Sequence, residues 1–171
     1  MAIVRAYQDN VPRIAEDAFV ADTATLIGNV SVGSGSSIWY GAVLRGDVGF
    51  IHVGVRSNIQ DLACVHMTRG VSNVEIGNDV TVGHGAIVHG AVIEDDVLIG
   101  MGAVVLDNVR VGRGSVIAAG ALLAPGTVVP ERSMVRGQAA KVVRTLEQHE
   151  LERARAVAAD YVRLAGDVRD A

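Results

Sequence analysis

Hydrophobic residues recur at intervals of six along most of this chain. Reading from Val20, the first residue of every six-residue step is Val, Ile or Leu, with irregular steps only at 44–53, 65–76 and 88–93. An alternating β-sandwich would instead show period two and irregular spacing. The pattern therefore indicates a hexapeptide repeat with these first positions: Val20, Leu26, Val32, Ile38, Leu44, Val53, Ile59, Val65, Ile76, Val82, Val88, Ile93, Ile99, Val105, Val111, Ile117, Leu123, Val129 and Val135.

Outside the long step at 65–76, the fifth residue of each step is usually Ala, Ser or Thr, and otherwise Val. A branched aliphatic and a small side chain at fixed places fill a narrow interior, while the other positions are free for turns and the outer surface. Three such steps make one coil of a triangular prism, so the fold class predicted is all-β, a parallel β-helix of about six coils. With only 4% aromatic residues, the core must consist of Val, Ile, Leu and Ala.

The repeat stops near Ala140, and the sequence then predicts an α-helix packed alongside the prism. We assign residues 1–144 to the β-helix domain, with 1–19 as an N-terminal cap segment, and residues 145–171 to the C-terminal helix. Thr145 and Gln148 have the spacing of a capping box, and Gly166 offers a stop signal. The helix should pack through an apolar stripe at helical spacing, formed by Leu151, Ala154, Val157, Ala158, Tyr161 and Leu164 or Ala165.

The repeat register places side chains of successive coils above one another. We treat the long steps at 44–53 and 65–76 as single steps that carry loops, so that Leu44, Val65 and Val88 stack. The residues that follow them, Arg45, His66 and His89, then form a column, with the two imidazoles about one inter-strand spacing apart. Two histidines stacked in this way can share a metal ion.

His84 occupies a different column, with Tyr40, Asp61 and Met101, on the neighbouring face of the prism. Within one chain it should not reach the metal of His66 and His89. It would do so if an identical prism packed alongside, and a two-plus-one arrangement closes into a threefold ring. His52, in the 44–53 loop, and His149, on the helix, are expected to be ordinary surface histidines.

Several segments together resemble the γ-class carbonic anhydrases. They are Trp39–Asp47 (WYGAVLRGD), Asn58–Asp61 (NIQD), Val65-His66, Val80–Gly90 (VTVGHGAIVHG), Leu98–Asp107 and Gly137–Lys141. The resemblance covers nearly the whole chain. It implies a left-handed prism, a homotrimer, and zinc (iron in some members) at each subunit interface. The implied reaction is the reversible hydration of CO2 to bicarbonate.

The resemblance also implies a role for each matching residue. His66, His84 and His89 match the metal ligands, in the split that the register indicates. Gln60 matches the residue that hydrogen-bonds the attacking water, and Arg45 matches an interface arginine near the bicarbonate site. Asp47 and Asp61 match carboxylates that pair with such arginines and organise the surroundings of the ligands.

The segment after the first ligand departs from the best-known members of the family. Those members carry an acidic loop with a proton-shuttling glutamate, whereas residues 67–73 (MTRGVSN) contain no carboxylate. The chain resembles a shorter subclass in which activity is often weak. Two alternatives remain open: a non-catalytic metal-binding or assembly protein of the same family, and a hexapeptide acyltransferase, which acyl-CoA binding would reveal.

Charge and composition restrict the other functional classes. A net charge of −4 gives no electrostatic basis for binding nucleic acid. The sequence shows no signal peptide and no apolar run long enough to cross a membrane, so a cytoplasmic protein is expected. Cys64 is the single cysteine, which excludes an intrachain disulfide and favours a reducing compartment.

Overall fold

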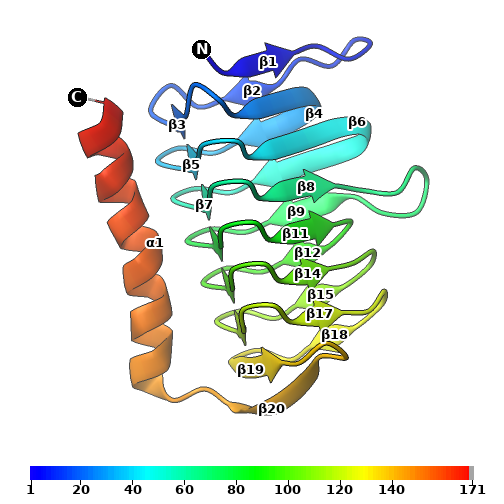
Figure 1. Cartoon of the computed structure of the whole chain (residues 1–171), viewed down its shortest axis with the longest axis vertical. Helices are drawn as coiled ribbons and strands as arrows, with labels where there is room; N and C mark the ends of the chain where they lie inside the picture. The colour runs from blue at the N-terminus through cyan, green and yellow to red at the C-terminus, as the bar shows by residue number, and fades with distance from the viewer. Residues whose placement is uncertain (170–171) are drawn as a thin grey trace.

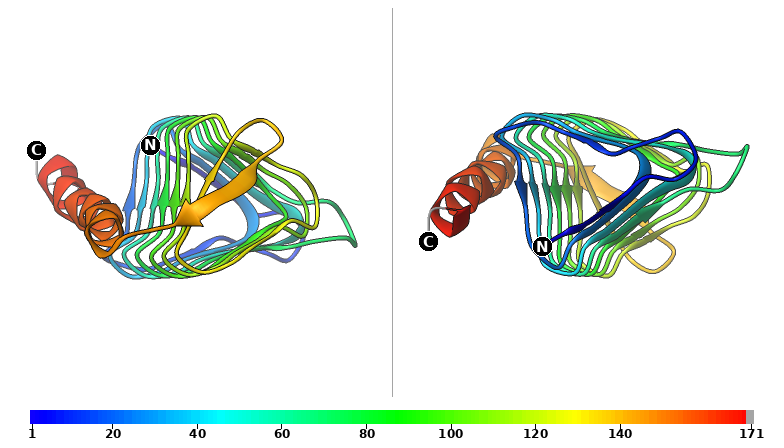
Figure 2. Two further views of the ribbon diagram at one scale, coloured as in Figure 1. Left: turned by 90° about the horizontal axis from the view of Figure 1, so that it is seen from below. Right: turned by 90° about the horizontal axis from the view of Figure 1, so that it is seen from above.

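The computed structural model of the protein describes residues 1–169, which form a triangular prism of stacked strands with one long helix beside it (Figures 1 and 2). All but one of the first positions of the repeat are buried, Val20 being half-buried. They point inward together with the small fifth-position residues and form one continuous core. The predicted parallel β-helix with a C-terminal helix is confirmed.

The first of the three faces, here called the helix face, is the one that α1 covers (Figure 2). It has seven parallel strands, so the prism has about seven turns rather than six, and the N-terminal segment supplies the strands that complete the first turn on the other two faces. An antiparallel strand, β20 (Lys141–Thr145), closes the bottom of the prism. The parallel strands are β3 (Phe19–Val20), β5 (Ser37–Ile38), β7 (Asn58–Ile59), β10 (Thr81–Val82), β13 (Leu98–Ile99), β16 (Val116–Ile117) and β19 (Ser133–Arg136).

The other two faces belong to one sheet, since β4 (Thr25–Val32) and β6 (Val43–Val53) bend around a corner and contribute to both. We call one of them the open face and the other the third face. The open face also contains β1 (Ile3–Arg5), β8 (Cys64–His66), β11 (Ile87–His89), β14 (Val104–Val105) and β17 (Leu122–Leu123). The third face also contains β2 (Arg13–Ile14), β9 (Val74–Ile76), β12 (Val92–Ile93), β15 (Arg110–Val111) and β18 (Val128–Val129).

The two long steps of the repeat are accommodated differently. The 44–53 step is not a loop: β6 stays extended throughout, and its residues 47–50 bulge opposite Asn29 alone, between the pairs Gly28↔Gly46 and Val30↔Ile51. The 65–76 step does carry a loop, residues 67–73, which projects from the corner between the open face and the third face (Figure 1). We call this corner the loop corner, and the corner between the helix face and the open face the helix corner.

The helix α1 (Gln148–Arg169) begins later than predicted. Thr145 is the last residue of β20, so the capping box predicted at Thr145 and Gln148 is wrong. Instead the Glu150 carboxylate accepts a hydrogen bond from the backbone N–H of Glu147, 3.0 Å away, and pairs with Arg144. The stop predicted at Gly166 is also wrong, because the helix continues to Arg169; the predicted end at residues 170–171 lies outside the described residues.

The predicted apolar stripe does face the prism, with Ala165 rather than Leu164 as its last buried member. Arg155 on α1 donates two hydrogen bonds to Asp96, which also accepts one from Arg113. Tyr161 packs edge-on against Trp39, with ring centroids 5.2 Å apart. These contacts fix the helix against the helix face.

Candidate metal centre

The register predicted for the two stacked histidines is confirmed. His66 ends β8, His89 ends β11, and the two residues are direct partners in adjacent parallel strands. Their facing ring nitrogens, His66 Nδ1 and His89 Nε2, lie 3.3 Å apart. Two nitrogens that bind the same tetrahedral metal ion, each at about 2.0–2.1 Å, lie about 3.3–3.4 Å from one another. The pair therefore already has the spacing of two metal ligands.

An aspartate holds the outer nitrogen of each ring. The Nε2–H of His66 donates to Asp47 Oδ1 at 3.0 Å, and the Nδ1–H of His89 donates to Asp107 Oδ2 at 3.2 Å. In a neutral ring held this way, the outer nitrogen carries the proton and the inner nitrogen keeps a lone pair. Two facing lone pairs repel unless a cation lies between them, so the chemistry of this donor set fits a bound metal ion.

Asp47 also binds Arg45, whose Nη1 donates to Asp47 Oδ2 at 2.5 Å. Burial raises the pKa of Asp47, but the hydrogen bonds from Arg45 and His66 lower it more, so the net pKa lies below its ordinary value. Asp47 is consequently a carboxylate that bridges the arginine and the histidine. The side chain of Arg45 is 43% exposed, which leaves it accessible to a small anion.

Asp107 was not assigned a role from the sequence, although it lies in a segment that carries the family resemblance. It accepts hydrogen bonds from Thr68 Oγ1, at 2.9 Å, and from Ser72 Oγ, both in the 67–73 loop. Burial raises the pKa of Asp107, and these two hydroxyl groups lower it to a net value below the ordinary one. The repeat register could have indicated its position near His89. Val105 pairs with Val88, which brings Asp107 to the same corner as His89.

His84 lies at the helix corner, in the turn after β10. Backbone hydrogen bonds stack its turn with those of Tyr40, Asp61 and Met101, which confirms the predicted column. Its Nδ1 lies 2.8 Å from Asp61 Oδ2, and its Nε2 lies 3.4 Å from the hydroxyl of Tyr161 on α1. Burial raises the pKa of Tyr161, as does the nearby charge of Asp61, so this hydroxyl keeps its proton.

Gln60 accompanies His84 at the helix corner. Its Oε1 accepts a hydrogen bond from the backbone N–H of His84 at 3.2 Å, and its Nε2 donates to Asn58 Oδ1 at 3.1 Å. The side chain is buried and held at both ends, with one amide hydrogen left over. Gln60, Asp61 and His84 thus form one group.

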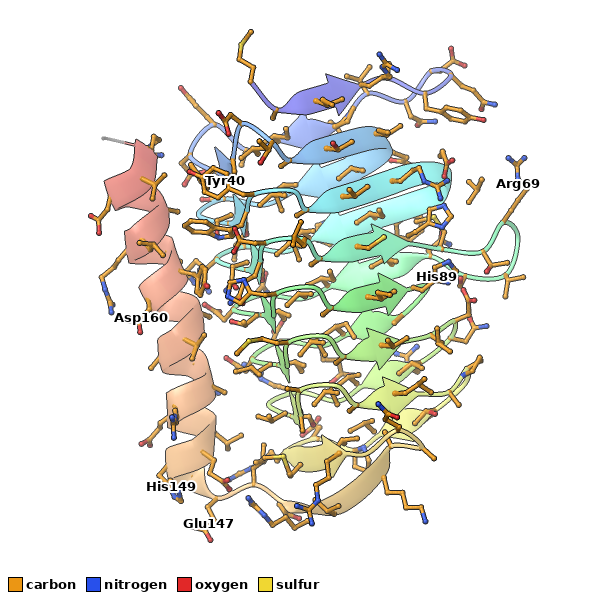
Figure 3. The ribbon with its side chains drawn as sticks, in the orientation of Figure 1. Tyr40, Arg69, His89, Glu147, His149 and Asp160 are labelled. Carbon is orange, nitrogen blue, oxygen red and sulfur yellow. The ribbon has the colours of Figure 1, made fainter. Side chains whose placement is uncertain are left out.

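The predicted site residues fall into two groups separated by the width of the open face. Arg45, Asp47, His66 and His89 lie at the loop corner, and Gln60, Asp61 and His84 lie at the helix corner. In Figure 3, His89 lies on the side of the loop that carries Arg69, whereas Tyr40, from the column of His84, lies on the side of α1. Among residues 1–169, no single-chain group of three or more His, Cys, Asp or Glu side chains is placed to hold a metal ion.

The two remaining histidines lie away from both groups. His52 is on β6 rather than in a loop, exposed, with its Nδ1 2.9 Å from Ser31 Oγ. His149 lies near the start of α1, is largely exposed and faces Glu147 at 3.3 Å. No helix within residues 1–169 has the length and apolar character needed to cross a membrane.

Comparison with known proteins gives the family. A model described as bacterial transferase hexapeptide (six repeats) matches residues 90–125. A probable carbonic anhydrase of Methanocaldococcus jannaschii is 51% identical over 89% of this chain and 95% of its own length. A carbonic anhydrase of Geobacillus kaustophilus is 39% identical over 94% of this chain and 87% of its own. Mitochondrial gamma carbonic anhydrase 2 of Arabidopsis thaliana is 43% identical over 92% of this chain, which spans only 58% of that relative's length.

Solved structures show the same fold under different names. A Bacillus cereus protein with a provisional acetyltransferase name has a TM-score of 0.97 and 37% identity, covering 99% of this chain and 98% of its own. A hexapeptide transferase family protein of Anaplasma phagocytophilum has a TM-score of 0.91 and 36% identity, covering 96% of this chain and 97% of its own. Taken with the sequence relatives, these matches show that the chain belongs to the γ-class carbonic anhydrase-like family of hexapeptide-repeat proteins.

Proposed function

We propose that three copies of this chain form a ring that holds a metal ion at each interface, and that each site reversibly hydrates CO2 to bicarbonate. The observation that carries the proposal is the 3.3 Å separation of His66 Nδ1 and His89 Nε2, each with an aspartate on its outer nitrogen. The relatives that bear carbonic anhydrase names supply the reaction.

The third ligand in this proposal is His84 of a neighbouring copy. His84 shares the ligand-like arrangement, with Nδ1 on an aspartate and Nε2 turned away from it. It is 44% exposed, against 17% for His66 and 28% for His89, as expected for a side chain that another subunit covers.

The surface between the two groups supports this assembly. The outward side chains of the open face are mostly apolar, in the column Thr25, Val43, Cys64, Ile87, Val104 and Leu122. Beside His84, the residues Leu62 and Met101 are 72% and 61% exposed. Contiguous exposed apolar surface of this kind marks an interaction site. Because the open face has the single histidine along one edge and the histidine pair along the other, head-to-tail packing of such faces can close into a ring.

Zinc suits a set of three neutral imidazoles, with iron as the alternative that the family resemblance implies. A bound Zn²⁺ lowers the pKa of water to about 7 and so supplies a nucleophile at neutral pH. Asp47 and Asp107 hold the tautomers of His66 and His89, Asp61 lies beside His84, and fixed ligands bind metal more tightly than mobile ones.

The other predicted residues act on the reactants in this proposal. Gln60 has one free amide hydrogen, which can orient the attacking water. The Arg45 guanidinium is held by Asp47 and partly exposed, so it can bind the anionic product bicarbonate. Gln60 would reach the reaction from the same subunit as His84, and Arg45 from the subunit of the histidine pair.

Mixed trimers of two inactive variants test the shared site. His66→Ala and His84→Ala should each fail to bind zinc tightly, since each leaves two ligands per site. Subunits refolded together in equal amounts should recover about a quarter of the sites, because each of the two sides is intact in half of the subunits. Equilibrium dialysis against zinc, followed by stopped-flow CO2 hydration, measures both quantities. A mixture that recovers no sites would rule out the split arrangement.

The same proteins can be used to test the two alternative functions. Zinc recovery without CO2 hydration, at full metal occupancy, would favour the non-catalytic metal-binding or assembly protein. The transferase names of the structural relatives favour a hexapeptide acyltransferase, which requires a binding groove for an acyl-CoA. Isothermal titration with acetyl-CoA and CoA separates that alternative, since a carbonic anhydrase should bind neither.

A further inference from the structure

Hydrogen bonds from its own side chains and backbone hold the 67–73 loop, although the loop has no acidic residue. Thr68 and Ser72 donate to the two carboxylate oxygens of Asp107, and Asn73 Oδ1 accepts from the backbone N–H of Phe50 at 2.9 Å. The loop turns tightly, because the N–H groups of Val71 and Ser72 both donate to the Thr68 carbonyl. This turn brings the Thr68 and Ser72 hydroxyls to the same side.

We propose that Asp107, clamped by Thr68 and Ser72, is a positioning residue for His89, and that the 67–73 loop thereby sets the metal affinity of the site. The inference rests on the proposed metal site and deepens it. It assigns the loop a role in holding a ligand, in a chain whose loop lacks the carboxylate needed to carry protons.

The geometry of the clamp gives the physical reason. Oδ2 of Asp107 accepts from both Thr68 Oγ1 and His89 Nδ1, at 2.9 and 3.2 Å, so the loop fixes the oxygen that fixes the imidazole. Without the hydroxyl donors, Asp107 can rotate and the imidazole can turn or change tautomer. The Nε2 lone pair would then no longer point steadily toward His66.

Gly90 makes the close approach of the loop achievable. Its φ is +67°, and a Cβ at this position would collide with Ser72 Oγ and Asp107 Oδ1. The backbone N–H of Asn108 also donates to the Gly90 carbonyl, at 2.7 Å, so Asp107 is anchored next to the ligand strand. The loop, Asp107 and His89 therefore form a chain of direct contacts.

Zinc affinity measured by competition with a chromophoric chelator tests the clamp. The double variant Thr68→Val, Ser72→Ala keeps the shapes but removes both hydroxyls, and its zinc Kd should rise about 10- to 100-fold, as for other outer-shell partners of ligating histidines. Asp107→Asn should weaken binding at least as much. The single variant Thr68→Ser keeps the hydroxyl and should bind zinc with near-wild-type affinity, whereas the single variant Thr68→Val should bind zinc more weakly.

A matched control separates this effect from general loss of stability. Ser34 donates to Asp17 Oδ2 at 2.7 Å in a remote turn, so Ser34→Ala removes a serine–aspartate bond of the same kind. It should leave zinc affinity unchanged. The visible spectrum of the Co²⁺-substituted protein should change in the loop variants and not in Ser34→Ala. The melting temperatures of the metal-free variants should differ little from one another.

The results distinguish the clamp from the function on which it rests. A wild-type protein that binds no zinc would overturn the metal site and the clamp together. Wild-type zinc binding that the loop variants and Asp107→Asn leave unchanged would overturn the clamp alone. Because no readout is enzymatic, a wild-type protein that binds zinc but hydrates no CO2 still tests the clamp in full.

Discussion

The two halves of the candidate site are held in place by different means. The pair at the loop corner is built within the prism: strand pairing sets the His66–His89 spacing, and Asp47 and Asp107 fix the rings. At the helix corner, His84 has one aspartate and a long contact to Tyr161, which α1 supplies. The first half is therefore complete in one chain, whereas the second depends on the docked helix and, in the proposed ring, meets the histidine pair of another subunit.

This difference indicates which half should tolerate perturbation. Parallel strands pair over several hydrogen bonds, so the backbones of His66 and His89 cannot separate without disrupting the prism, and only their side chains can turn. The packing of α1 relies on a narrow stripe of small side chains and on the ion pairs of Asp96. Perturbations of the interface or of α1 should consequently affect His84 before they affect the pair.

Removing a ligand should have the largest effect. Alanine at His66, His84 or His89 should lower zinc content from about one ion per chain to a small fraction, because too few ligands remain for tight tetrahedral binding. Among the three, His84→Ala should retain the most residual zinc, since it leaves the prearranged pair intact. Metal analysis after gel filtration measures this, with His52→Ala as the control that keeps full content. Loss of zinc in His52→Ala but not in His84→Ala would show that the register argument is wrong.

Breaking the subunit interface should separate the two halves of the site. Ile87 projects outward on the open face, and Ile87→Arg would place an unpaired charge in the proposed contact. Light scattering should give three times the 17.8 kDa chain mass for the wild type and about a single chain mass for this variant, with loss of tight zinc binding. Val128→Arg, at an exposed position on the third face, should remain trimeric. A wild-type chain that is monomeric and still loaded with zinc would refute the two-plus-one site.

Proton removal should limit the rate of CO2 hydration, because the hydroxyls of Thr68 and Ser72 are committed to Asp107 and the loop has no carboxylate. Turnover should rise several-fold as imidazole is added at fixed pH and ionic strength. Exchange between CO2 and bicarbonate at chemical equilibrium, followed by isotope labelling, should not respond to the buffer. High turnover at low buffer would point instead to Tyr161 or to a water chain from Asp61 as the proton carrier.

The smallest expected effect concerns the docking of α1. Burial raises the pKa of Asp96, but hydrogen bonds from Arg155 and Arg113 outweigh it, so its folded pKa lies below the unfolded value of about 3.9. Its stabilising contribution is therefore fully present above about pH 4 and is lost as the pH falls through the folded pKa. Asp96→Asn should cost about 1 kcal/mol, since both arginines are half exposed.

Fluorescence of Trp39, the single tryptophan, reports this docking because Tyr161 packs against it. Acid titration of the wild type should change the emission at a pH where the core remains folded. Asp96→Asn should show no such transition. An unchanged acid transition in the variant would assign helix docking to other contacts.

The prediction of the fold came from one periodic signal, and the signal was strong because of geometry. A prism with three narrow faces requires an inward branched side chain every six residues, so Ile99 or Val111 can be placed inside without knowing any neighbour. The same register gave the stacking of His66 on His89 and the separate column of His84. Where the six-residue period is broken, as in 44–53, the register predicted a loop, whereas the structure has the continuous strand β6. The spacing could not separate the two, because an extended bulge and a loop both add residues between two repeat positions.

The sequence by itself determined the repeat, the core and the columns of the three histidines, because strand pairing in a β-helix converts sequence spacing directly into position. Asp47 and Asp61 could be named from the family resemblance, but only the tertiary structure decided that Asp107 and Tyr161 also contact the histidines. The contacts of Asp107 with Thr68, and of Tyr161 with His84, join segments 39 and 77 residues apart. They depend on how a loop folds back and how a helix docks, and neither follows the six-residue period. The same holds for the start of α1, where Glu147 and Glu150 form the hydrogen bond predicted for Thr145 and Gln148, because β20 keeps Thr145 extended.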